Sequence, residues 1–329
     1  MRDVAAAARV SVKTVSRVHN KNPNVAAATR KNVQDAIDRL GYLPNTLATT
    51  FRDGRSPVIV VAVTDVGDPY FSAIVRQVDH MAAAQKMLTV VAGIGEDPAN
   101  ERVQIEALLG RRVSGLILAP VSDNQSYLVP WVGQIPMVFI DRRPSHLAAD
   151  SFTTDNVGGA DEATAHLVGH GHRVVAFLGD SPQVQTTADR LTGYAGALAK
   201  AGLPVRPELV AWDGATRPGA AAAIRRLRDV PDPPTALFSS NARCTIALAP
   251  LLHDLGMALL SFGDFPMSDV LVPAVTVLDQ DPARLGELAL ARLLDRIANP
   301  DRRYRRREVL PATLIERDSC RRPAPAGQY

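Results

Sequence analysis

Cysteine is scarce in this sequence, and the signals of a membrane or exported protein are missing. The 329 residues contain two cysteines, Cys244 and Cys320, too few and too far apart for a disulfide framework or a structural zinc site. The apolar run Val58–Val63 is far shorter than the ~18 residues that span a bilayer. Met1 is followed by a charged, alanine-rich stretch that does not resemble a signal peptide. We therefore expect a cytoplasmic protein without membrane contact.

The sequence also lacks the motifs of common enzymes and cofactor sites. It contains no GxSxG, no HExxH and no phosphate-binding GxxxxGK[ST] segment. The glycine pair in residues 93–95 follows a predicted strand, but Pro98 stands where a dinucleotide-binding loop needs its third glycine. His166, His170 and His172 have a spacing that suits a metal, but the sequence places no carboxylate or cysteine near them. We therefore expect no catalytic residues, no cofactor and no metal site.

What the sequence does contain is a basic N-terminal segment on a mildly acidic body. Residues 1–57 carry ten lysines and arginines against four aspartates, a net charge of +6, and the remainder carries −3. The composition is 46% hydrophobic and 22% charged, as in soluble proteins that bury a large core. The length suggests two or three domains. A basic end of this kind is typical of a protein that presents one face to a polyanion.

The hydrophobic pattern changes at the end of this basic segment. Helical spacing predicts helices at 3–9, 11–20 and 29–40, followed by a linker at 53–57. Beyond it, apolar strands alternate with amphipathic helices, which indicates doubly wound parallel sheets. Nine strands are expected, at Val58–Thr64, Leu88–Ala92, Gly115–Ala119, Met137–Ile140, Val174–Leu178, Leu209–Trp212, Ala236–Ser239, Leu259–Phe262 and Val275–Leu278. Because nine strands exceed the usual single sheet, we expect two α/β subdomains.

The second predicted helix has the pattern of a DNA-reading helix. Ser11 can cap its start, and Val12, Val15 and Val18 form one apolar stripe that would pack on the preceding helix. The opposite face is polar and basic, and such a face can enter the major groove of DNA. It carries Lys13, Ser16, Arg17 and Asn20, with Thr14 at its border. The pattern alone suits an ordinary amphipathic surface helix equally well.

Several short motifs around this helix resemble the lactose repressor/galactose repressor (LacI/GalR) family. Asp3–Ala5, Val10-Ser11, Thr14–Val18, Thr29-Arg30, Gly41-Tyr42 and Pro44-Asn45 follow in the order and spacing of that family's helix-turn-helix head. The resemblance implies that Val12, Lys13 and Arg17 take the base-reading positions. It also implies a hinge helix at 45–52 that folds when two protomers meet on DNA. Its expected DNA contacts are Asn45, Leu47, Ala48 and Phe51, with Phe51 where the family has a minor-groove leucine.

The resemblance continues through the body of the chain. Asp68–Phe71, Asp141-Arg142, Gly171–Arg173, Arg190-Leu191 and Gln280–Pro282 match motifs of the family's sensor domain. It implies a periplasmic-binding-protein-like (type I) core of two doubly wound parallel-sheet subdomains that clamp a small molecule. The expected effector-binding residues are Tyr70, Phe71, Asp141, Arg190, Asn241 and Asp264. An aromatic wall, a carboxylate and a guanidinium together suit a carbohydrate.

Two departures from the family pattern fall on the effector side. The family's Asn-Asp pair reads Asn241-Ala242 here, and its G-[FY]-D-D motif reads Ser261-Phe262-Gly263-Asp264. The first aspartate of that motif is therefore glycine, and Asp264 would have to serve in its place. We expect an effector that differs from the best-known ones, or altered contacts to its hydroxyl groups.

The sequence thus predicts a homodimeric transcriptional regulator, a repressor, whose affinity for double-stranded operator DNA is set by a sugar-like effector. The expected DNA-binding domain is 1–43, and the hinge helix and linker occupy 44–57. The effector-binding core is expected at 58–329. Its N-subdomain is placed at 58–157 and 283–309 and its C-subdomain at 158–282 and 310–329. The alternative is a sugar-binding protein without DNA-binding activity, which would not need the +6 head.

Overall fold

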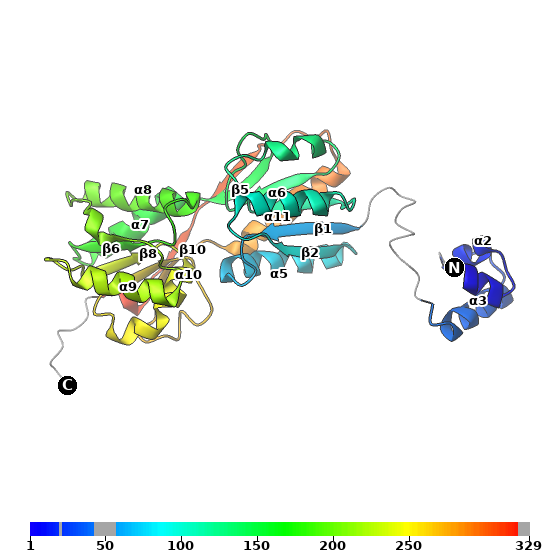
Figure 1. The fold of residues 1–329 in the computed structure, drawn as a ribbon, viewed down its shortest axis with the longest axis horizontal. Coiled ribbons are helices and arrows are strands. Elements are labelled where there is room, and N and C mark those ends of the chain that lie inside the picture. The colour runs from blue at the N-terminus through cyan, green and yellow to red at the C-terminus, as the bar shows by residue number, and fades with distance from the viewer. Residues whose placement is uncertain (20–21, 43–56, 322–329) are drawn as a thin grey trace. The chain divides into compact units, whose positions relative to one another are not determined.

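A computed structural model describes residues 1–19, 22–42 and 57–321 of the chain (Figure 1). The chain divides into two compact units, Met1–Ser56 and Pro57–Tyr329. The described residues of the first unit are helical, and the second contains two six-stranded sheets covered by helices. The expected fold class is confirmed. No helix in the described residues is both long and apolar enough to cross a bilayer.

Three short helices form the described part of the N-terminal unit. They are α1 (Arg2–Ala7), α2 (Val12–His19) and α3 (Ala27–Arg39). Val4, Val15, Val18 and Val33 are buried together between them. Each helix alone is too short to be stable in water, so this shared apolar core is what holds the unit together.

The first sheet of the larger unit is parallel throughout, in the order β11-β5-β4-β3-β1-β2. Its strands are β1 (Val58–Val63), β2 (Leu88–Gly93), β3 (Gly115–Leu118), β4 (Met137–Ile140), β5 (Asp150–Thr154) and β11 (Arg307–Leu310). Ile59 and Val61 of β1 pack under α5 (Pro69–Ala84) and α11 (Pro282–Ala298). Val60 and Ala62 face the opposite cluster with α6 (Pro98–Leu109) and the 3₁₀ helix η1 (Ser126–Trp131). Successive side chains of a strand point to opposite faces of the sheet. An apolar strand such as β1 is therefore buried on both of its faces.

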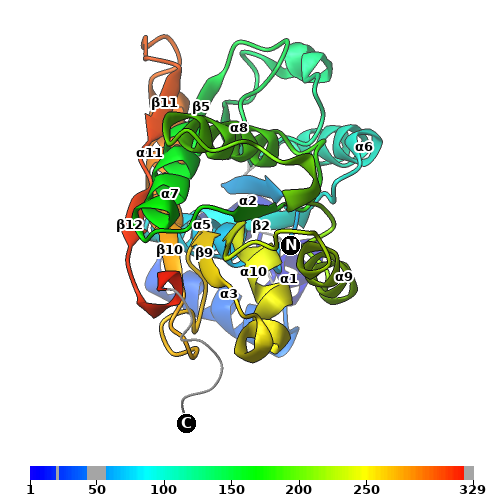
Figure 2. The ribbon, with the colours of Figure 1, turned by 90° about the vertical axis from the view of Figure 1, so that its left-hand side faces the viewer.

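The second sheet has the order β12-β10-β9-β8-β6-β7, with β12 antiparallel to β10. Its strands are β6 (Val175–Leu178), β7 (Val210–Ala211), β8 (Ala236–Ser239), β9 (Ala258–Phe262), β10 (Thr276–Asp279) and β12 (Thr313–Ile315). One face is covered by α7 (Asn156–Gly169) and α8 (Gln185–Lys200), the other by α9 (Arg217–Arg228) and α10 (Ala242–Leu248). Figure 2 shows these two helical layers. Three short 3₁₀ helices complete this part: η2 (Pro207–Leu209), η3 (Ala249–Asp254) and η4 (Asp318–Cys320).

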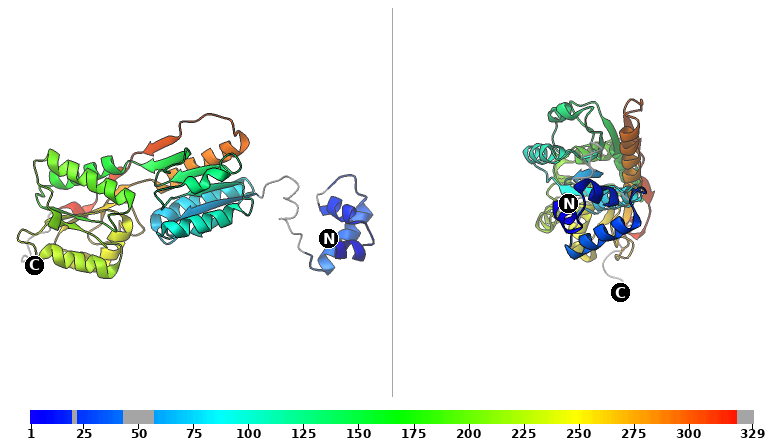
Figure 3. Two further views of the ribbon diagram at one scale, coloured as in Figure 1. Left: turned by 45° about the horizontal axis from the view of Figure 1, so that its top comes forward. Right: turned by 90° about the vertical axis from the view of Figure 1, so that its right-hand side faces the viewer.

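The chain passes three times between the two sheets (Figures 1 and 3). The crossings follow β5 at Asp155, β10 at 280–281 and β11 at 311–312. Each subdomain is therefore built from separate stretches of sequence. Leu310 is still part of β11 in the first sheet, one residue beyond the boundary expected from the sequence.

Three strands were not expected from the sequence: β5, β11 and β12. The segment DSFTT of β5 is mostly polar, and β11 and β12 are short, so none forms an apolar run. They become strands because neighbours already in the sheet pair with their backbones. β2 is apolar in sequence, but its side chains Leu88 and Val91 are exposed. The reason is that β2 is the edge strand of its sheet.

Candidate functional site

The start of α2 is capped as its sequence predicts. The Ser11 hydroxyl accepts a hydrogen bond from the backbone N–H of Thr14 at 3.1 Å, and the two hydroxyls lie 2.9 Å apart. Val15 and Val18 are buried, but Val12 is 43% exposed. The expectation that all three valines pack inward is therefore wrong for Val12. Helical side chains lean toward the N-terminus, so the first residue of α2 projects past the packed face.

The polar face of α2 is open to solvent. Ser11, Lys13 and Arg17 are exposed, and Thr14 and Ser16 are half-buried. This leaves two basic side chains and an apolar Val12 on one accessible surface, which is the arrangement that base reading requires. The other expected DNA contacts, Asn20, Asn45, Leu47, Ala48 and Phe51, lie outside the described residues.

Side-chain to backbone hydrogen bonds fix the turn around α2. Asn32 of α3 donates to the Ala8 carbonyl at 2.8 Å, and so closes the end of α1. Arg30 donates to the Asn22 carbonyl at 3.0 Å on the far side of α2. Arg9 adopts a left-handed backbone with φ of 53° between α1 and α2. These contacts hold the angle at which α2 is presented.

In the larger unit, loops from both subdomains line a small cavity of about 40 Å³, hereafter the cleft cavity. Asp68 follows β1 and Asp141 follows β4 in one sheet, whereas Asp180 follows β6 and Asn241 follows β8 in the other. These residues meet because side chains just after parallel strands gather at one edge of the sheet. The expected Tyr70, Phe71, Asp141, Arg190 and Asn241 all line this cavity.

Arg190 is the most constrained side chain of the cleft cavity. It is 4% exposed, and its guanidinium lies 3.9 Å from the centre of the Phe262 ring. Its Nε donates to Asn156 at 2.8 Å and its Nη1 to the Ser240 carbonyl at 2.6 Å. Within the described residues no hydrogen bond engages Nη2, which leaves this nitrogen to donate to a ligand. Burial lowers the pKa of Arg190, and the charges of Asp141 and Asp180 oppose that shift.

Asp141 and Tyr70 lie beside this guanidinium. Burial raises the pKa of Asp141, and the charges of Arg142 and Arg190 partly counter it. The Asp141 carboxylate is 3.4 Å from Nε of Arg142, and its backbone is left-handed with φ of 66°. Burial also raises the pKa of Tyr70 well above its ordinary value. The cleft therefore holds a carboxylate acceptor, a guanidinium donor and a phenol within one small space.

Asn241 and Asp264 are occupied by structural contacts. Asn241 caps α10 by accepting from the Cys244 N–H at 2.9 Å, and it donates to Asp180 at 3.0 Å. Asp264 does not line the cleft cavity. Its carboxylate instead binds Arg317 at 3.0 Å and the Ser268 hydroxyl, and thereby ties β9 to the C-terminal segment. The structure does not bring Asp264 together with the other expected effector residues.

The sequence reading missed Arg243 and its acidic neighbours. Arg243 of α10 is 3.1 Å from Asp180, 3.5 Å from Asp68 and 3.8 Å from Glu96. Asp68 and Glu96 belong to the N-subdomain and Arg243 to the C-subdomain, so these two ion pairs cross the cleft. The pair with Asp180 lies within the C-subdomain. Asp180 was detectable as an acid that comes two residues after the apolar strand β6.

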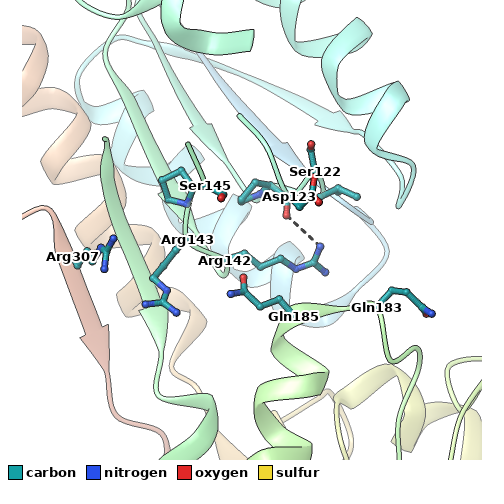
Figure 4. Close-up of a pocket in the computed structure, with 11 residues that line it drawn as sticks. Ser122, Asp123, Arg142, Arg143, Ser145, Gln183, Gln185 and Arg307 are labelled. Atoms are coloured by element: carbon teal, nitrogen blue, oxygen red, sulfur yellow. Dashed lines mark hydrogen bonds between the residues drawn. The ribbon is translucent and has the colours of Figure 1, made fainter. Parts of the chain in front are cut away.

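A larger cavity of about 430 Å³ adjoins the cleft cavity and shares Arg142 with it (Figure 4). We refer to it as the side cavity. Its lining is polar and basic, and includes Ser122, Ser145, Arg142, Arg143, Gln185 and Arg307. Arg142 donates to the Pro120 carbonyl at 3.2 Å (Figure 4), and it lines both cavities. The volume falls within the 300–1,000 Å³ typical of ligand pockets.

Two family models match the chain. The model of bacterial regulatory proteins of the lacI family matches residues 1–45, and that of the periplasmic binding protein-like domain matches 164–320. Curated relatives include the HTH-type transcriptional repressor PurR of Mannheimia succiniciproducens, 28% identical over 96% of this chain and 97% of the relative. The ribose operon repressor of Escherichia coli K12 is 29% identical, with 97% and 99% covered.

Solved structures of similar proteins include regulators of the same kind. A transcriptional regulator CelR–cellobiose complex is 27% identical, covers 96% of this chain and 98% of its own, and has a TM-score of 0.69. The lac repressor dimer bound to operator and the anti-inducer ONPF shares the fold, with a TM-score of 0.81, 24% identity and coverage of 97% and 98%. The repressors found are regulators and not enzymes. The chain therefore belongs to the lacI family of bacterial transcriptional regulators, with a helix-turn-helix head that binds DNA and a periplasmic-binding-protein-like effector domain.

Proposed function

We propose that this repressor acts in the cytoplasm as a homodimer on a pseudo-palindromic operator, and that a sugar-like effector in the cleft controls its DNA affinity. The observation that carries this proposal is the cleft cavity, where Asp141 and Arg190 from different subdomains meet under an aromatic wall. A ligand bound to both would change how the two subdomains sit against one another.

On the DNA side, α2 is the proposed reading element. Lys13 and Arg17 are exposed on its outer face, and each is long enough to reach guanine edges in the major groove. Ser11, Thr14 and Ser16 are proposed to contact phosphates. A dimer would place two such helices in successive major grooves, with the expected hinge residues between them.

On the effector side, the chemistry favours a polyhydroxylated ligand. A carboxylate and a guanidinium accept and donate in one plane, as neighbouring sugar hydroxyls require, and Tyr70 or Phe71 can pack on the ring face. The cleft cavity alone has room for little more than a water molecule. The side cavity supplies the missing volume, and Arg142 lies between the two. The CelR structure with cellobiose and the ribose operon repressor are relatives whose names include sugars.

Effector binding is proposed to act by shifting a population between two cleft angles. A ligand that binds one angle better than the other stabilises it by that difference in affinity. The ion pairs of Arg243 across the cleft favour the narrow angle in the absence of ligand. The two angles would present the two heads of the dimer differently to DNA.

The test is binding of the purified protein to its own upstream DNA, titrated across salt and with a panel of sugars. We expect specific binding with a steep salt dependence, because phosphate contacts release counterions. One sugar should change the affinity. A protein that binds a sugar but no DNA would favour the sugar-binding alternative. Binding to neither DNA nor any sugar would contradict the proposal.

A further inference from the structure

A cluster of metal-ligand side chains lies at the C-terminal end of α7, away from the residues of the cleft. His166, His170 and Glu316 each place one ligand atom within 4.8 Å of the others. The two imidazole rings have centroids 4.6 Å apart and stand at 68° to one another. Nε2 of His170 is 3.5 Å from a carboxylate oxygen of Glu316.

The two histidines meet because they are four residues apart on one helix. Side chains at i and i+4 lie on the same helical face. The backbone N–H of His170 bonds to the carbonyl of His166 at 3.1 Å, so the helical turn continues through this pair. The carboxylate arrives from a distant part of the sequence: β12 pairs with β10, and Glu316 follows β12 directly.

This arrangement corrects the expectation that no carboxylate lies near these histidines. The sequence could not show that β12 brings Glu316 to α7. In the structure, His172 does not belong to the cluster that His166 and His170 form with Glu316. The ring of His172 contacts the hydroxyl of Thr235 at 2.9 Å and the carbonyl of Cys320 at 3.1 Å, and so has a structural role.

The state of His166 is the second independent observation. Its Nε2 is buried and has no hydrogen-bond partner among the described residues. A ring nitrogen without a partner, next to a second imidazole and a carboxylate, is available as a ligand.

We propose that His166, His170 and Glu316 bind a zinc ion. Two imidazoles and one carboxylate are a common zinc ligand set, and a water molecule completes four-coordination. Zinc ligands lie about 2 Å from the metal, so the three ligand atoms, which lie within 4.8 Å of one another, must draw closer around the ion. The Glu316 side chain is 56% exposed and has room to adjust. No thiolate competes within the described residues, since burial raises the pKa of Cys320 to about 11 and that of Cys244 to about 12.

The bound ion would join two segments of the C-subdomain. One is α7, which begins just after the crossing at Asp155, and the other is the segment after β12, which follows the crossing at 311–312. Zinc would thus stabilise the folded C-subdomain, because an ion that binds only the folded state shifts the unfolding equilibrium. This inference does not depend on the identity of the effector or on DNA binding.

The experiment uses the full-length protein without a histidine tag, stripped of metal by a chelator. We expect calorimetric titration with zinc to show one ion bound per chain, and zinc to raise Tm. His170→Gln and Glu316→Gln should each weaken zinc binding at least tenfold and remove most of the rise in Tm. His253→Gln, a change at an exposed histidine in η3, serves as the matched control and should bind zinc as the parent does.

Cobalt provides a separate readout of the ligand set. Tetrahedral cobalt with imidazole ligands absorbs visible light, and this band should disappear in His170→Gln. Far-ultraviolet circular dichroism of each variant without metal shows whether it is folded. Absence of zinc binding to the folded parent would overturn the proposal. Zinc binding that is unchanged in both His170→Gln and Glu316→Gln would also overturn it, since the ion would then lie elsewhere.

Discussion

Arg243 lies 3.1 Å from Asp180 in its own subdomain and 3.5 Å from Asp68 in the other. Asp68 also caps α5 through the Tyr70 N–H, and Asp180 accepts hydrogen bonds from Thr187 and the Ser181 backbone. Both carboxylates are thus held rigidly by their own subdomains. A single guanidinium between two fixed carboxylates favours a narrow cleft without a ligand.

Removing this guanidinium should widen the cleft. In Arg243→Gln the distance between labels on opposite subdomains should increase and its distribution broaden. Spin labels at Val103→Cys and Arg225→Cys suit this measurement, since both positions are exposed and the two native cysteines are buried. Arg284→Gln, which removes an exposed pair with Glu287 on one helix, is the control. An unchanged distance distribution in Arg243→Gln would show that these ion pairs do not set the cleft angle.

The buried guanidinium of Arg190 should be needed for effector binding but not for DNA binding. Arg190→Lys keeps the charge but loses the planar fork, so we expect effector affinity to fall by about 1.5–3 kcal/mol. Operator affinity without effector should stay close to that of the parent. Calorimetry with the effector and a mobility-shift titration measure the two quantities. Arg225→Lys on exposed α9 is the control. A normal effector response in Arg190→Lys would remove this residue from the site.

Arg17 should contribute to sequence-specific DNA binding. Arg17→Ala should cost about 1–3 kcal/mol on the operator and relax the preference at one base pair, with a smaller loss on random DNA. Fluorescence anisotropy on both DNAs at one salt concentration measures the difference. Arg39→Ala, an exposed change at the end of α3, should not alter the ratio of the two affinities. Equal losses for Arg17→Ala on operator and random DNA would show a phosphate contact instead.

The contact between α7 and α8 depends on glycine at 193. A Cβ there would lie 2.2 Å from the Val157 carbonyl and 2.8 Å from the Ala160 Cβ. We expect Gly193→Ala to destabilise the core by about 1–3 kcal/mol, because the helices must separate. Gly196→Ala on the same helix has only an ordinary contact at 3.5 Å and should stabilise by about 0.5–1 kcal/mol. Urea denaturation checks both, and similar effects at the two positions would contradict the close packing.

Asp180 should make stability depend on pH in acid. Burial would raise its pKa, but hydrogen bonds from Thr187 and Ser181 and the charge of Arg243 outweigh it and hold the pKa below the ordinary 3.8. Such a group stabilises the fold above pH 3.8, and the contribution is lost as the pH falls through the folded-state pKa. Asp180→Asn should therefore lower stability at neutral pH.

Denaturation of Asp180→Asn and the parent across pH tests this. The difference in unfolding free energy between the two proteins should narrow below about pH 3.8, because the parent then loses the charge of the Asp180 carboxylate. A difference that stays constant from neutral pH to about pH 3 would show that the carboxylate charge is not the source of the stabilisation.

Local patterns in the sequence were sufficient for the main outline. The cap at Ser11, the buried pair Val15 and Val18, and apolar runs such as β1 each depend on a few neighbouring residues. The family resemblance implied that Asp141 and Tyr70 lie in one effector site, and both line the cleft cavity. The cap, the buried valines and the apolar strands are set by helix and strand periodicity, which can be read along the sequence.

The tertiary structure decided which distant segments of the chain pair with one another. β5, β11 and β12 have no strong pattern of their own and form because a neighbouring strand offers hydrogen bonds. Asp264 pairs with Arg317 and not with the cleft, and Glu316 reaches His170 from beyond the last crossing. Arg243 meets Asp68 only when the two subdomains face each other. Such contacts depend on strand order and on the three crossings, and no periodicity along the chain contains that information.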